Sequence, residues 1–146
     1  MAEKMTNQAT VANRGAMAER SLVALVQRWI VTLHMAALAA QVVFALLLLA
    51  GIPGMLQLHS ANAWVVLALG LVQAMAIMPS WPSGSSLWKV AAGLVLLAEV
   101  AQIQLGRSAS LPAHVTLGTV LWGLSLALLI QVWAPSWGRQ SRGTTS

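Results

Sequence analysis

His59 and His114 are the residues whose type and spacing most suggest a joint chemical role. Each follows a glycine, Gly51 or Gly106, by eight residues, and each stands near the start of a long apolar run. Imidazole nitrogens bind transition metals well, and two of them can ligate one haem iron from opposite faces. The spacing therefore predicts a pair of metal ligands at matching depth on two helices.

Small residues accompany both histidines on the same predicted helical face, at 100° per residue. The two histidines are 55 residues apart. The same offset relates Ala63 to Gly118 and Gly70 to Ser125. Such residues leave room for a flat macrocycle next to its axial ligands. We therefore expect a haem b site with His59 and His114 on the iron, lined by Ala63, Gly70, Gly118 and Ser125.

Glu99, Gln102 and Arg107 complete the candidate set. Glu99 and Gln102 share one face of a predicted helix, and Glu99 lies roughly 10 Å from its outer end at a rise of 1.5 Å per residue. We expect these two residues to form a proton or substrate site. Arg107, in the adjacent loop, could pair with a haem propionate.

The elements that position these residues are predicted to be membrane spans. The chain has 146 residues, of which 58% are hydrophobic and 8% are charged, with a mean hydropathy of +0.76. Soluble domains carry about 25% charged residues, and about 20 apolar residues cross a bilayer as a helix. Short connections separate four such runs, which predicts an all-α, up-down four-helix bundle. The predicted spans are 29–50, 58–78, 87–105 and 112–132.

The net charge of +5 is interpreted as a topology signal, because cytoplasmic loops of membrane proteins are rich in Lys and Arg. In a four-span chain seven of the eight cations fall on one face, and only Arg107 falls on the other. This distribution predicts a cytoplasmic, partly disordered segment over 1–28, a transmembrane domain over 29–133 and a cytoplasmic tail over 134–146. An aromatic belt on the same face is predicted from Trp29, Trp81, Trp88, Trp133 and Trp137.

Several function classes lack the residues they need. There is no cysteine, which excludes disulfides, Cys-ligated zinc, iron–sulfur clusters and thioether-linked haem. No phosphate-binding loop or nucleophile motif is present, so hydrolase and kinase functions are not indicated. Nucleic acid is not an expected partner, whereas the lipid bilayer is.

A structural interpretation competes with each functional one, because polar side chains also hold transmembrane helices together. That interpretation is favoured for His34, which lies at a depth similar to that of Gln73 and could bond to it. For the pair of His59 and His114, metal ligation and structural hydrogen bonding both stay open. Function is favoured for Glu99, because an unpaired carboxylate is costly in lipid.

The segments around the histidines resemble a family of small four-span bacterial membrane proteins, over about residues 28–133. More distantly, the layout resembles cytochrome b561-like bundles and one four-helix half of haem A synthase, in which histidines of the second and fourth helices lie near the outer surface. The segments that carry the resemblance are Leu33-His34-Met35 with Gln41, Leu58-His59-Ser60-Ala61-Asn62, and Pro112-Ala113-His114-Val115.

The resemblance implies a bacterial cytoplasmic-membrane protein that binds haem b. Haem A synthase has an acidic residue near the second-helix histidine where this chain has the neutral Gln57, so haem binding is implied more than haem modification. The leading hypothesis is electron transfer by one haem, with a quinone or a redox protein as partner, rather than a stand-alone enzyme. The alternatives are a small proton-coupled transporter that uses Glu99 in a homodimer, and a non-catalytic subunit of a larger membrane complex.

Overall fold

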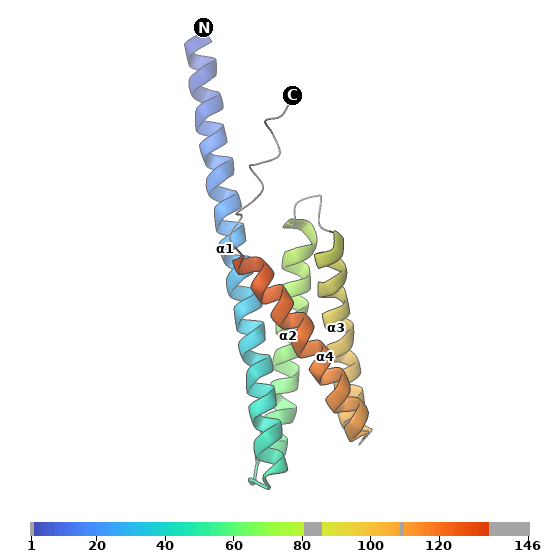
Figure 1. The fold of residues 1–146 in the computed structure, drawn as a ribbon. Coiled ribbons are helices and arrows are strands. Elements are labelled where there is room, and N and C mark those ends of the chain that lie inside the picture. Colours follow the sequence, from blue (N-terminus) through green and yellow to red (C-terminus); the bar gives the residue numbers. More distant parts are fainter. Residues whose placement is uncertain (1, 81–85, 109, 135–146) are drawn as a thin grey trace.

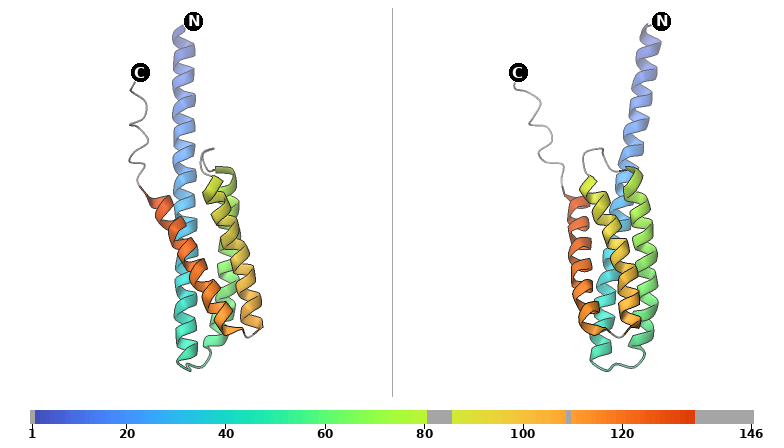
Figure 2. Two further views of the ribbon diagram at one scale, coloured as in Figure 1. Left: turned by 45° about the vertical axis from the view of Figure 1, so that its right-hand side comes forward. Right: turned by 90° about the vertical axis from the view of Figure 1, so that its right-hand side faces the viewer.

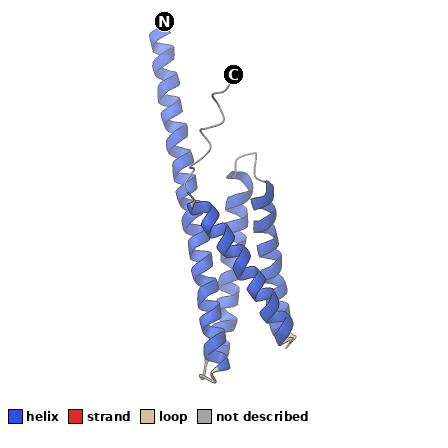
Figure 3. Cartoon of the chain, in the orientation of Figure 1, coloured by secondary structure: helices blue, strands red, loops and turns tan. Residues whose placement is uncertain are grey.

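The computed structural model describes residues 2–80, 86–108 and 110–134, and within them every regular element is a helix (Figure 3). The helices are α1 (Ala2–Leu49), α2 (Met55–Ser80), α3 (Ser86–Arg107) and α4 (Leu111–Trp133). All four are long and apolar enough to cross a membrane. The predicted all-α, four-span architecture is confirmed.

Consecutive helices are antiparallel neighbours, and α4 packs back against α1 to close the bundle (Figures 1 and 2). The resulting order places α1 diagonally opposite α3, and α2 diagonally opposite α4. The α1–α2 turn and the α3–α4 connection lie at one end of the bundle, which we call the turn end. Because α2 and α4 both begin there, His59 and His114 lie near the same end, as predicted.

The α1–α2 turn is sharply defined by two glycines with positive φ, Gly51 at 77° and Gly54 at 80°. The amide of Ile52 donates to the carbonyl of Leu47 at 3.1 Å, and that of Gly51 donates to Leu48 at 3.0 Å. These two bonds are the Schellman arrangement, in which a glycine in the left-handed region ends a helix. The local sequence therefore fixes where α1 stops and α2 begins.

The start of α1 differs from the predicted span, because the helix begins at Ala2 rather than near Trp29. Residues 2–28 contain no proline and several alanines, and alanine has the highest intrinsic helix propensity. The segment therefore continues the helix of the first span and extends it beyond the rest of the bundle (Figure 1). Trp81, Trp137 and residues 135–146 lie outside the described residues.

The bundle interior is narrow, and large apolar side chains also cover the outside, as expected for helices surrounded by lipid. Fully buried apolar residues include Ile77, Val95 and Leu128, whereas more than half of the surface of Leu46 and Leu97 is exposed. The buried polar residues are His34, Gln73, Glu99 and Ser125.

Candidate functional site

Two groups of polar side chains lie one above the other inside the bundle. The first, near the turn end, contains His59 and His114, which we call the histidine pair. The second contains His34 and Glu99, which we call the His34–Glu99 pair. On α1, seven residues separate His34 from Gln41, which contacts His59. The two groups are therefore about 10 Å apart along the bundle axis.

The histidine pair is formed across the bundle by α2 and α4. The ring centroids of His59 and His114 lie 6.1 Å apart, with the ring planes inclined by 64°. Both rings are partly buried. The prediction that these two side chains face each other is confirmed.

Hydrogen bonds to backbone carbonyls hold both rings in the same tautomer. Nδ1 of His114 lies 3.1 Å from the carbonyl oxygen of Gln102, and Nδ1 of His59 lies 3.3 Å from that of Gln41. A carbonyl oxygen can only accept, so each Nδ1 carries the proton. In the neutral imidazole the lone pair is then on Nε2. Metal-ligating histidines are usually held in this way by a second group.

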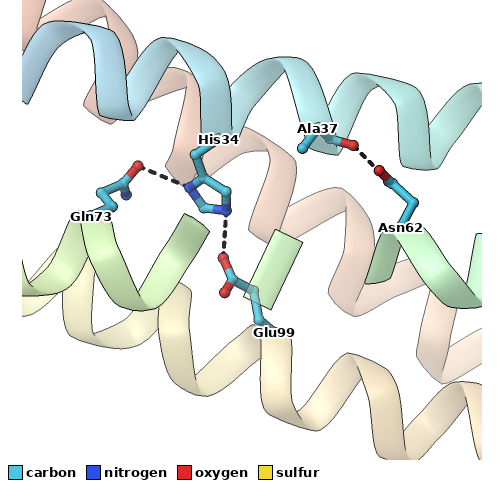
Figure 4. A network of polar contacts seen from close by, with 5 residues as sticks. All are labelled: His34, Ala37, Asn62, Gln73 and Glu99. Atoms are coloured by element: carbon cyan, nitrogen blue, oxygen red, sulfur yellow. Dashed lines mark hydrogen bonds and ion pairs between the residues drawn. The ribbon is translucent and has the colours of Figure 1, made fainter. Parts of the chain in front are cut away.

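The Gln41 side chain lies against His59 and was not assigned a role from the sequence. Its Nε2 lies 3.2 Å from Nε2 of His59 and donates to the His59 carbonyl at 3.0 Å. Its Oε1 accepts from Nδ2 of Asn62 at 2.7 Å, and the same nitrogen donates to the Ala37 carbonyl at 2.9 Å (Figure 4). The lone pair of His59 therefore accepts from an amide in this structure.

The four residues predicted to line the haem lie at two depths in the bundle. Ala63 lies one turn below His59. A Cβ at Gly118 would lie 2.6 Å from Nε2 of the Gln102 side chain, which covers this glycine. Gly70 and Ser125 lie eleven residues beyond their histidines, about 16 Å along the helices. They lie well below the histidine pair, and Gly70 contacts Glu99.

Arg107 is exposed and ends α3 at the turn end. It follows Gln102 by five residues, about 7.5 Å of helix. Because the Gln102 carbonyl accepts the bond from His114, α3 places this cation on the turn-end side of the histidine pair. Gln102 itself is partly buried, and its Oε1 has no hydrogen-bond partner in the described part of the chain.

The His34–Glu99 pair joins α1 to α3 across the other diagonal of the bundle (Figure 4). Nε2 of His34 lies 2.7 Å from Oε1 of Glu99, and Nδ1 of His34 bonds to Oε1 of Gln73 at 2.9 Å. The three side chains are at most 2% exposed. The predicted bond between His34 and Gln73 is confirmed. The partner of Glu99, which was not assigned from the sequence, is His34.

Gly70 makes room for this carboxylate. An added Cβ would overlap the Glu99 carboxylate, whose Cδ would be only 2.6 Å away. Glu99 therefore lies directly over the α2 backbone, and its Oε2 is buried there without a hydrogen-bond partner.

No known protein family, curated protein or solved structure matches the chain. The chemistry of the two pairs therefore rests on their own contacts.

Proposed function

We propose that this protein is a membrane b-type haem protein that transfers electrons, with His59 and His114 as axial ligands. One observation carries the proposal: two facing imidazoles each donate Nδ1–H to a carbonyl and keep the lone pair on Nε2. Two such nitrogens on diagonal helices supply both axial positions of one iron. When bound, haem b supplies a one-electron couple.

The residues around the pair fit such a group if two glutamine side chains move. Imidazole nitrogens bind metals at about 2 Å, so the Gln41 amide must leave Nε2 of His59. The Gln102 amide must also swing away from Gly118. The two carbonyls that hold the Nδ1 protons belong to the backbone, so rotation of either glutamine side chain leaves those bonds in place.

The basic residues support an orientation of the bundle in the membrane and a role for Arg107. With the cations of α1 placed in the cytoplasm, both termini are cytoplasmic and the turn end faces outward across a bacterial cytoplasmic membrane. The histidine pair is then close to the outer surface, where a quinone or a redox protein would exchange electrons with a haem bound between the two histidines. Arg107 at that end would neutralise a haem propionate.

Absorbance tests the proposal directly. The protein is expressed in a haem-competent host, purified in mild detergent, and measured reduced minus oxidised beside His59→Ala and His114→Ala. We expect a low-spin b-type spectrum that is lost in both variants. Gln104→Ala is the control, because Gln104 is exposed on the same helix as the Gln102 carbonyl, and it should leave the spectrum intact.

A protein that stays colourless even after haem is offered in vitro would refute the haem proposal. If such a colourless protein carried protons into vesicles, and Glu99→Gln stopped that flux, the transporter alternative would be supported instead. If the spectrum survives either histidine substitution, the substituted residue is not an axial ligand.

A further inference from the structure

The His34–Glu99 pair has no part in holding a haem, yet it is the most deeply buried acid–base contact among the described residues. His34 is 0% and Glu99 is 2% exposed, and they come from diagonally opposite helices. Hydrogen bonds between neutral side chains would hold two helices together equally well.

The contacts fix how many protons the pair holds in this structure. Oε1 of Gln73 accepts from Nδ1 of His34, so Nδ1 is protonated. Nε2 of His34 and Oε1 of Glu99 are 2.7 Å apart, and two lone pairs would repel each other at that distance. Either the imidazole or the carboxyl group therefore holds one proton. In either case the pair as a whole is neutral.

Among the described residues, no other charge lies at this depth. From α2 the pair meets the Gln73 amide and the backbone of Gly70, and neither titrates. On α4 the described titratable residue is His114, at the turn end. On α1 the nearest cation is Arg28, six residues away, and its Nε donates to the Val132 carbonyl at 2.9 Å. Loss of the shared proton would therefore leave an uncompensated negative charge in an apolar interior, which is costly.

We propose that the His34–Glu99 pair is a proton-binding site that takes up its proton when a haem that the histidine pair would hold is reduced. This inference rests on the proposed haem function. An oxidised haem held by His59 and His114 would carry one more positive charge near His114, which would favour the deprotonated, negative pair. Reduction by a quinol, or by an electrode, removes that charge, and one proton from water then enters between His34 and Glu99. One electron and one proton arrive together, so the net charge inside the membrane does not change.

The path for this coupling is short. The Gln102 carbonyl that holds the proton of His114 lies one turn from Glu99 on α3, about 4.5 Å of helix. The two pairs are about 10 Å apart on α1. Charges interact strongly over such distances where water is excluded.

Proton uptake on reduction tests the coupling. The haem-loaded protein is reduced electrochemically in weakly buffered detergent across a series of pH values, and a pH indicator counts the protons. We expect up to about one proton per electron for the wild type, with a maximum where the pair titrates. In Glu99→Gln the maximum should be absent. Glu19→Gln makes the same chemical change at an exposed position and should behave as the wild type.

The coupling would be overturned if the wild type takes up no protons at any pH, or if Glu99→Gln takes up as many protons as the wild type. In either case a b-type haem spectrum would still support the proposed function. A protein without haem overturns both. A second readout needs no haem: infrared difference spectra of wild type minus Glu99→Gln in H₂O and D₂O. Either a protonated carboxyl band or an imidazolium band that shifts on deuteration supports the shared proton. A spectrum that shows an ionised carboxylate beside a neutral imidazole at every pH overturns it.

Discussion

Replacing Gly70 with alanine tests whether the close approach of α2 to Glu99 is needed for the His34–Glu99 pair. The new Cβ would overlap the carboxylate, and Gly70 itself is buried. The side chain of Glu99 must then rotate away from His34. The expected result is a less stable protein, although alanine is the better helix former.

The magnitude follows from three terms. An extra methyl in a packed interior costs about 1–3 kcal/mol. Breaking a buried pair costs up to about 3–5 kcal/mol, and only part of this is lost if the carboxylate finds a new partner. Alanine returns about 1 kcal/mol of helix propensity. We therefore expect a net loss of about 2–4 kcal/mol in the free energy of unfolding.

The measurement is unfolding of the purified protein by titration with a denaturing detergent. Gly93→Ala is the matched control, because Gly93 is also inside a helix and a Cβ there would meet no atom within 4 Å. Its stability should be unchanged or slightly higher. In a Glu99→Ala background the overlap disappears, so Gly70→Ala should no longer destabilise. Equal effects of Gly70→Ala with and without Glu99 would refute the reasoning, since coupled neighbours show interaction energies of about 0.5–3 kcal/mol.

Two further substitutions test the contacts that frame the bundle interior. Gln73→Leu leaves Nδ1 of His34 buried without an acceptor and should cost about 1–3 kcal/mol in the same unfolding titration. The exposed control Gln104→Leu should stay within about 0.5 kcal/mol of the wild type, and a similar loss in both would contradict this account. Arg28→Ala removes a bond to a backbone carbonyl and a cation–π contact 5.2 Å from the ring centroid of Trp133. It should cost about 1–2 kcal/mol and change the tryptophan fluorescence, and an unchanged emission spectrum would argue against the contact.

The four spans could be predicted from the sequence because hydropathy and turn residues act locally. Gly51 and Gly54 mark the first turn in the sequence, and both have positive φ in the structure. The facing of His59 and His114 was also predictable, because each lies only a few residues from the start of its helix. Over so short a stretch the helical phase and the depth accumulate little error.

The pairing of His34 with Glu99 was not predictable in the same way. Counted from the turn end, His34 lies 15 residues along α1 and Glu99 only 8 residues along α3, a difference of about 10 Å. They meet because the α1–α2 turn extends further than the α3–α4 connection (Figure 1). Such an offset depends on how whole helices pack. The one sequence signal was chemical: a carboxylate inside a span needs a partner, and His34 was a possible one.

The order of the chain gives the His34–Glu99 pair a consequence for membrane insertion during synthesis. The helix α3 has the lowest mean hydropathy of the four candidate spans, 1.4 against 1.7 to 2.1 for the others, and a charged residue at the centre of a helix costs about 2.5–3.5 kcal/mol on insertion scales. When α3 emerges from the ribosome, α1 and α2 have already been made, and His34 is available to pair with Glu99. The third span is therefore expected to depend on the first for efficient integration, so that His34 assists the biogenesis of a helix synthesised more than 50 residues later.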